Sequence, residues 1–106
     1  MAKAAEMIWS GRMISADEAL ALGIVSQLTE PESLMDEAMA LARTFAEGPP
    51  ISIRLAKRAM YRSMDSSLEE ALEFETFAQN VCRDTKDAKE GIAAFVEKRE
   101  PKFTGE

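Results

Sequence analysis

Glycine and proline interrupt this sequence at short intervals, and between the interruptions apolar residues recur three or four positions apart. That spacing puts them on one face of an α-helix, because a helix turns once in about 3.6 residues. Glycine readily adopts the left-handed conformation that follows a helix, and proline cannot continue one. The breaks are Gly11, Gly23, the Gly48-Pro49-Pro50 run and Pro101. The pattern predicts an all-α chain of five or six short helices.

Capping boxes mark two of the helix starts: a serine hydroxyl accepts from the third helical amide and a glutamate reaches back. They are Ser15-Ala-Asp-Glu18 and Ser67-Leu-Glu-Glu70. The β-branched stretch Ile24–Leu28 is expected to be extended without forming a full sheet. By its length the chain is predicted to be one domain, residues 1–106. The expected helices are residues 3–9, Ser15 to about Leu22, Thr29 or Glu30 to Gly48, Ile51–Met64, Leu68–Arg83, and a last helix from between Asp84 and Asp87 to Pro101.

Composition argues against several classes of function. The chain has 13 Lys and Arg against 19 Asp and Glu, and its formal charge of -6 repels a nucleic-acid backbone. It has no histidine, and Cys82 is its only cysteine, which we expect to be a buried structural thiol. We therefore expect no metal site and no internal disulfide. No apolar run approaches membrane-spanning length and no signal pattern opens the chain, so we expect a cytoplasmic protein without a membrane partner.

Two charged features of the predicted helices have both a structural and a functional interpretation. Arg54, Arg58 and Arg62 lie opposite the apolar arc of their helix, as a solvated face or a phosphate site would. Glu75 falls inside the apolar arc of the next helix, where an unpaired buried carboxylate would be costly. We predict that it forms an ion pair with Lys57, in a structural rather than a catalytic role.

Methionines and one glycine raise further questions about packing. Met35 with Met39, and Met60 with Met64, are spaced four residues apart, which is typical of core packing but also of adaptable contact surfaces. Gly91 stands inside the last helix, where glycine costs about 1 kcal/mol relative to alanine. Its presence predicts a close approach by another backbone. None of these patterns determines a function.

Four stretches, taken in order, resemble the C-terminal region of the crotonase superfamily, the enoyl-CoA hydratases and isomerases. They are residues 10–25, Pro49-Pro50 followed by Lys57, residues 67–75 and residues 87–99. Together they cover almost the whole chain. The resemblance implies a small orthogonal bundle of helices, equivalent to the trimerisation part of those enzymes and lacking their spiral core of ββα units.

In that family the spiral core supplies the oxyanion hole for the thioester carbonyl and the carboxylates that move protons. The resemblance therefore implies that this chain contains no catalytic residue and is incomplete as an enzyme by itself. It also implies a homo-oligomer, a trimer or hexamer, in which the final helix covers a CoA site. At the matching positions Phe95 would pack on CoA and Lys98 would meet its phosphates, an i,i+3 pair. The alternative is a core ring and a solvated helix end.

The substrate that the resemblance implies is an acyl-CoA thioester, with no covalently bound cofactor. Hydratase and isomerase activities both remain open, and so does the acyl group. A second hypothesis is a free-standing helical module that keeps this fold only for oligomerisation. The gene sequence upstream of Met1 would separate the two. A nucleic-acid-binding bundle is disfavoured by the charge of -6.

Overall fold

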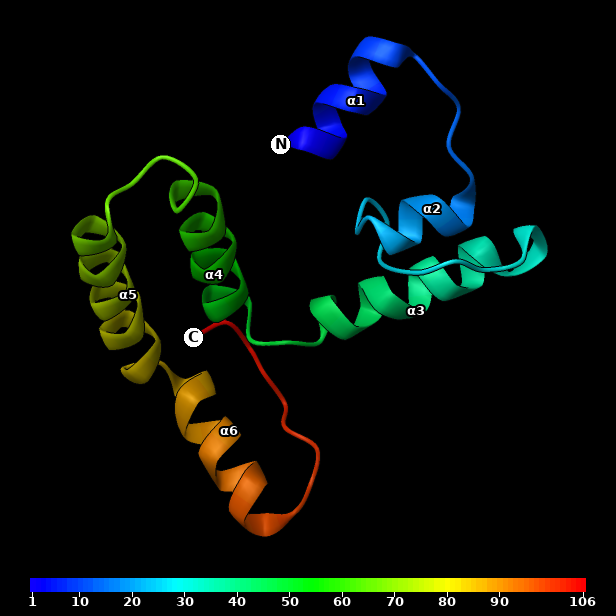
Figure 1. Cartoon of the computed structure of the whole chain (residues 1–106). Coiled ribbons are helices and arrows are strands. Elements are labelled where there is room, and N and C mark those ends of the chain that lie inside the picture. Colours follow the sequence, from blue (N-terminus) through cyan, green and yellow to red (C-terminus); the bar gives the residue numbers. More distant parts are fainter. The chain divides into compact units, whose positions relative to one another are not determined.

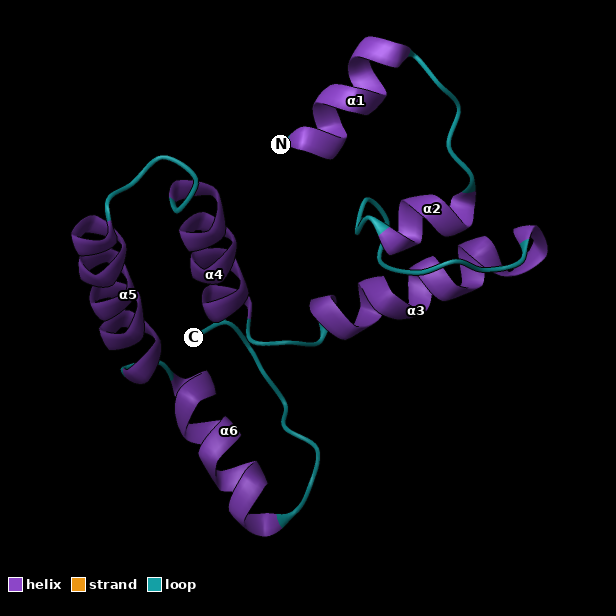
Figure 2. Cartoon of the chain, in the orientation of Figure 1, coloured by secondary structure: helices purple, strands orange, loops and turns teal.

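The computed structural model describes all 106 residues, and every regular element in it is helical (Figures 1 and 2). The predicted all-α class is confirmed, and the stretch expected to be extended after Gly23 forms bends and no strand. None of the helices is long and apolar enough to cross a membrane. The elements are α1 (Ala2–Ser10), α2 (Ala16–Ala21), the 3-10 turn η1 (Pro31–Ser33), α3 (Leu34–Ala46), α4 (Pro50–Arg62), α5 (Leu68–Arg83) and α6 (Lys86–Glu97).

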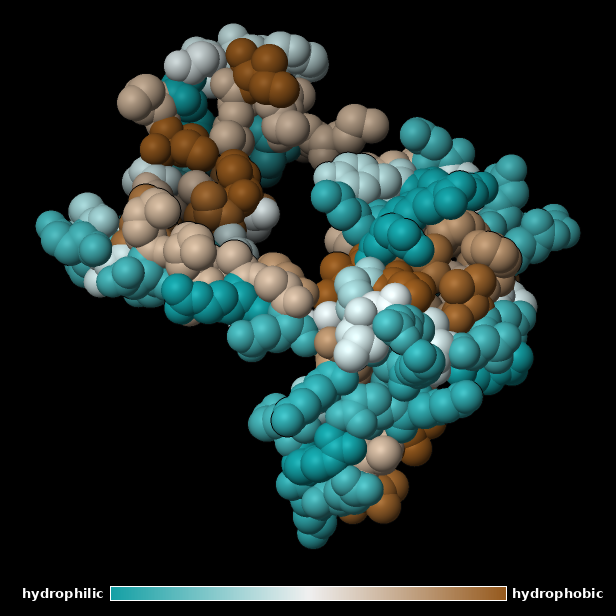
Figure 3. All heavy atoms as spheres, turned by 180° about the vertical axis from the view of Figure 1, so that it is seen from behind, coloured by the Kyte–Doolittle hydropathy of each residue, from teal (hydrophilic) through white to brown (hydrophobic).

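Contacts divide the chain into two compact units, residues 1–37 and 38–106. In the first unit Arg12 joins the two N-terminal helices. Its guanidinium donates to both carboxylate oxygens of Glu18, at 3.0 and 2.6 Å, and lies 3.4 Å from Glu6. The Ser15 hydroxyl accepts from the Glu18 amide, as predicted, but the Glu18 carboxylate binds Arg12 and does not reach back, so the predicted capping box is only half formed. Polar bonds thus hold this unit together, while most of its large apolar side chains are exposed. Figure 3 shows hydrophobic atoms gathered on its surface.

The start of the third predicted helix differs from expectation. Glu30 holds the cap position of η1 but makes no side-chain capping bond. The Thr29 hydroxyl instead donates to the Glu37 carboxylate, at 2.6 Å, and Gln27 donates to the same carboxylate. A glutamate one helical turn inside α3 thus holds the incoming chain, in place of a capping side chain before the helix.

The second unit is built around an antiparallel pair, α4 and α5. Ser52 near the start of α4 donates to the Cys82 thiol near the end of α5, with 3.3 Å between oxygen and sulfur. Leu55 and Phe74 are the buried apolar residues of the pair. The Ser67–Glu70 capping box that opens α5 is present, with each side chain bonded to the other's backbone amide. Cys82 is half-buried rather than fully buried.

The methionine pairs do not pack in a core. Met35, Met39, Met60 and Met64 are all exposed, so the prediction of core packing is wrong for this chain. The buried apolar set is small: it consists of Leu55, Phe74 and Ala94, and most other large apolar side chains are exposed. The alternative role of the methionines as a contact surface stays a prediction.

The C-terminal segment turns back along α6 and ends beside the N-terminal end of α4 (Figure 1). Its anchor is Asp87, which is only 3% exposed. One carboxylate oxygen of Asp87 accepts from the Thr104 amide at 2.7 Å and the other from the Gly105 amide at 2.9 Å. In the reverse direction the Lys86 and Asp87 amides donate to the main-chain oxygen of Glu106, at 2.6 and 3.3 Å. The first turn of α6 and the tail therefore satisfy each other's polar groups.

Two glycines fit this arrangement in different ways. Gly105 has φ +81°, and a Cβ there would lie 2.9 Å from Pro50 Cγ, so the position requires glycine. At Gly91 the nearest atom to a Cβ would be Cε1 of the Phe103 ring, at 3.6 Å. The prediction of a close approach by another backbone is therefore wrong: an aromatic side chain covers Gly91, at ordinary contact distance.

Replacing Asp87 by alanine is expected to release the tail. Two tail amides would lose their acceptor, at a cost of about 1–3 kcal/mol in the free energy of unfolding. Urea unfolding measures the loss, and hydrogen exchange of the Thr104 and Gly105 amides locates it. Asp84→Ala is the matched control, since Asp84 lies three residues earlier and its side chain is 77% exposed. Equal effects of the two substitutions would contradict the assigned role of Asp87.

Gly91→Ala is expected to stabilise the chain. The new methyl group would meet the Phe103 ring at 3.6 Å, an ordinary van der Waals contact. The gain in helix propensity is about 1 kcal/mol. Thermal unfolding of the two proteins tests this, with Gly105→Ala as the control that is expected to destabilise. A lower melting temperature for Gly91→Ala would show that the Phe103 ring cannot accept the methyl group.

Candidate functional site

The two sides of α6 have opposite surroundings. The side that carries Asp87, Gly91 and Ala94 lies under the C-terminal tail, and Asp87 and Ala94 are buried. The other side carries Ile92, Phe95 and Val96, which are all exposed. Thr85 caps the start of the helix through the Ala88 amide, at 3.0 Å. The tail thus occupies the small-residue side of α6 and leaves the larger apolar side chains uncovered.

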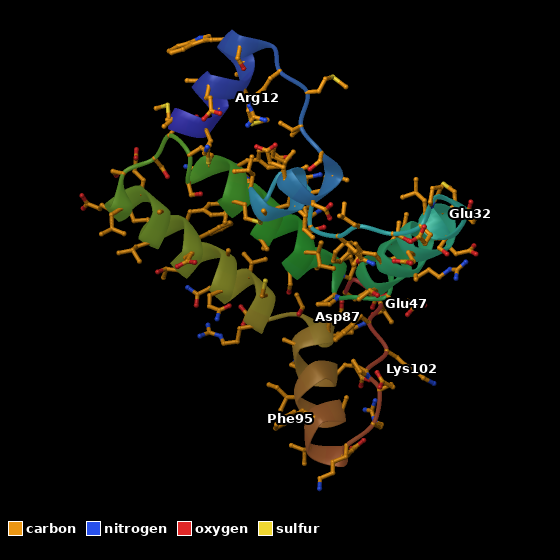
Figure 4. All side chains as sticks on the ribbon, turned by 45° about the vertical axis from the view of Figure 1, so that its right-hand side comes forward. Arg12, Glu32, Glu47, Asp87, Phe95 and Lys102 are labelled. Carbon is orange, nitrogen blue, oxygen red and sulfur yellow. The ribbon has the colours of Figure 1, made fainter.

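Phe95, one of the two predicted CoA contacts, is 84% exposed. Figure 4 shows it pointing away from the tail segment that carries Lys102. Phe95 therefore packs in no core within this chain, and its role in a complete protein stays a prediction. An open aromatic face of this kind can stack on a planar group or pack on an aliphatic one.

Lys98, the second predicted CoA contact, lies just beyond the end of α6 and has φ 55° and ψ 42°. It is the only residue other than glycine with a positive φ. Its amide donates to the Phe95 carbonyl at 3.3 Å, and the Arg99 amide donates to the Ala94 carbonyl at 3.0 Å. This pair of bonds is the Schellman motif, in which glycine is the usual residue. The i,i+3 geometry expected within a helix does not apply, because Lys98 has left the helix.

Glu90 fixes the chain that follows Lys98. Its carboxylate accepts two bonds from the Arg99 guanidinium, at 2.5 and 2.9 Å, and one from the Lys102 amide, at 2.9 Å. The Arg99 bonds, followed by the Lys102 amide bond, lower the pKa of Glu90 to about 2. The two bonds that Arg99 donates to Glu90, with a third that it donates to Glu97 at 2.6 Å, raise the pKa of Arg99. Arg99 is therefore fully engaged, whereas Lys98 makes no ion pair.

Beside the apolar side of α6 lies a hollow of about 340 Å³ between α5 and α6. Two cationic side chains, Arg83 and Lys89, line it together with Cys82. A larger groove of about 520 Å³ runs between α4 and α5. No group of three or more acidic, cysteine or histidine side chains is placed to hold a metal ion.

The predicted pair of Glu75 and Lys57 is wrong. Both side chains are exposed and no ion pair joins them. Glu75 lines the open groove between α4 and α5, where it remains hydrated and needs no partner. The arginine stripe is exposed, as the interpretation of a solvated face predicted, and two of its members also contact a core ring: the guanidinium groups of Arg58 and Arg62 lie 5.4 and 4.9 Å from the Phe74 ring centroid. They cover a core ring while remaining exposed.

A family model described as enoyl-CoA hydratase/isomerase matches residues 1–106. The chain belongs to the enoyl-CoA hydratase/isomerase family. It is 41% identical over 104 residues to an (E)-benzylidenesuccinyl-CoA hydratase of Thauera aromatica, covering 98% of this chain and 41% of the relative. It is 37% identical to a short-chain-enoyl-CoA hydratase of Clostridium acetobutylicum, covering 93% of this chain and 38% of the relative.

A crystal structure of an enoyl-CoA hydratase from Bacillus anthracis matches the whole chain with a TM-score of 0.93 and 38% identity. The match covers 41% of that hydratase. The chain thus spans about two fifths of the length of the family members that it matches. Membership of the enoyl-CoA hydratase/isomerase family confirms the resemblance at the level of the superfamily.

Sequence reasoning did not identify the residues that shape the end of α6. In the sequence Asp87 marks only the expected start of the last helix, and the pattern assigns no role to Glu90. The available indication was their i,i+3 spacing on one helix face, followed by Arg99 and a proline-containing tail. Acidic residues one turn apart that precede an irregular segment can accept its main-chain amides. The roles of Phe95 and Lys98 as ligand contacts stay predictions.

The pKa of Glu90 is expected to be measurable by NMR titration of its side-chain carbon, at about 2 against an ordinary 4.5. Because the folded-state pKa is depressed, the Glu90 carboxylate stabilises the fold above pH 4.5, and this contribution disappears as the pH falls toward 2. The difference in unfolding free energy between the native chain and Glu90→Gln should therefore shrink over the same pH range. A Glu90 midpoint close to 4.5 would show that the Arg99 bonds do not persist in solution.

Proposed function

We propose that this chain is the C-terminal helical part of an enoyl-CoA hydratase that acts on acyl-CoA thioesters. The family match, the order of its four characteristic stretches and its coverage of 41% of the first relative support this assignment. The relatives named above are hydratases, which favours addition of water over double-bond migration. In this proposal the reaction centre belongs to the rest of the enzyme, and this chain contributes no catalytic residue.

The proposed contribution of this chain is one edge of the CoA site, formed by Phe95 and Lys98. The observation that carries the proposal is the left-handed backbone of Lys98. Lysine is unfavourable there by about 1 kcal/mol or more, and glycine would avoid that cost. A strained residue at a surface position supports a role for its side chain. An ammonium group that makes no ion pair, one residue beyond a helix with an exposed phenylalanine, suits a ligand with both phosphates and a flat ring system.

A second proposed contribution is to oligomer contacts, in a homotrimer or hexamer. The exposed methionines of α3 and α4 and the uncovered apolar side of α6 support it, because such surfaces favour association. The same surfaces would serve a free-standing oligomerisation module, which is the second candidate function. A cytoplasmic location and the absence of a nucleic-acid partner stay predictions from the sequence.

Lys98→Gly tests the CoA edge, because it separates binding from folding. In the complete protein that carries this chain, the substitution should weaken CoA binding by about tenfold, the effect of losing one charge-assisted bond. It should leave the fold equally stable or up to about 1 kcal/mol more stable, since glycine suits the left-handed position. Titration calorimetry with CoA and thermal unfolding give the two quantities.

Lys102→Ala is the matched control, because Lys102 is an exposed lysine of the tail whose side chain makes no bond. It should leave CoA binding within a factor of about two. Unchanged CoA affinity in Lys98→Gly would remove Lys98 from the site. A large loss of stability in the same variant would show that the lysine stem, and not its charge, is what the position needs.

A further inference from the structure

We infer that Glu90 is a positioning residue for the CoA edge: through Arg99 and the Lys102 amide it holds the left-handed turn that directs Lys98 toward the ligand. The inference rests on the proposed function of Lys98. It assigns Glu90 no contact with the ligand, since its carboxylate is occupied by three hydrogen bonds within the chain.

The conformation of Lys98 needs support from beyond its own residue. An L-amino acid with a side chain adopts φ 55° at a cost, and such conformations persist only where the surroundings enforce them. The Schellman bonds close the helix end but do not fix where the chain goes after Arg99. Glu90 supplies that restraint, because it binds residues 99 and 102 at one carboxylate, two turns before the helix end.

The charges around this turn are divided between two roles. The Arg99 guanidinium lies 2.5 Å from Glu90 and 2.6 Å from Glu97, so its charge is neutralised within the chain. Lys98 lies between Glu97 and Arg99 in sequence. It forms an ion pair neither with Glu97 nor with Glu90, the two carboxylates that bind Arg99. The acidic cluster thereby holds Arg99 and leaves the ammonium of Lys98 available.

The position of Phe95 fits the same arrangement. Its carbonyl accepts from the Lys98 amide, so the aromatic ring and the lysine belong to one closed turn. A ligand that contacts both must meet them at a fixed separation. Any loosening of residues 99–102 would let the Lys98 backbone return toward common conformations and would change that separation. The expected consequence of losing Glu90 is weaker CoA binding without loss of any atom that touches CoA.

A double-mutant cycle tests this inference in the complete protein that carries the chain, with CoA as the probe. The variants are Glu90→Gln, Lys98→Ala and their combination. Glu90→Gln alone should raise the dissociation constant for CoA roughly three- to tenfold, the range expected for residues coupled in one network. In the Lys98→Ala background it should have no further effect on CoA affinity, because the group that it positions is gone. Its effect on stability should persist in that background.

Three controls keep the outcome decisive. Glu47→Gln removes an exposed carboxylate that makes no bond and should leave CoA affinity unchanged. Arg99→Lys retains the charge but loses the two-bond fork, so it should reproduce the effect of Glu90→Gln, and it replaces that variant if the glutamine protein does not fold. Circular dichroism verifies that each variant is folded.

The results separate the inference from the proposed function. If Lys98→Ala leaves CoA affinity unchanged, the proposed CoA edge fails and the positioning role of Glu90 fails with it. If Lys98→Ala weakens binding but Glu90→Gln does not, the edge stands and the positioning role is overturned. Additive effects of the two substitutions on CoA affinity would also overturn it, because Glu90 would then act independently of Lys98.

Discussion

The arrangement of the second unit depends on carboxylates of α6 that accept main-chain amides of the tail. Residues 100–106 form no helix or strand, so their amides lack the partners that regular structure provides. Asp87 takes two of these amides and Glu90 takes a third. The tail in turn gives its last main-chain oxygen to the free amides of the first turn of α6. Each segment therefore supplies hydrogen-bond partners for main-chain groups of the other that would otherwise have none.

Within this chain the covered side of α6 is the side with small residues, and the side with large apolar residues is exposed. An amphipathic helix normally buries its apolar stripe, but here the tail covers Gly91 and Ala94, where small side chains permit a close approach. Ile92, Phe95 and Val96 are left outside. Hydrogen-bonded carboxylates hold the tail on that side, and the Phe103 ring of the tail supplies an apolar contact at Gly91. The exposed stripe remains free for a ligand or another protein surface.

The helices could be predicted from the sequence because their ends depend on local chemistry. The capping serines Ser15 and Ser67 bond within three residues of their own positions, so the sequence contains the whole interaction. The burial of side chains could not be predicted in the same way. The outward position of Met60 and the hydration of Glu75 depend on which helix faces meet, and periodicity does not contain that information. The bond that holds the tail joins the Asp87 carboxylate to the Thr104 amide, seventeen residues away in sequence, so it could not be predicted from local pattern either.

The candidate site combines a predictable part with a part that required the structure. Family resemblance pointed to Phe95 and Lys98, but only the backbone angles show that Lys98 occupies a position suited to glycine. Stability alone favours glycine there, and the chain retains lysine in an environment that has already neutralised the adjacent arginine. In a chain with a charge of -6, an ammonium without an ion pair at the end of an exposed apolar stripe is a local exception to the overall charge. In the inference drawn above, the Glu90 bonds that hold residues 99 and 102 also determine where this positive charge is presented.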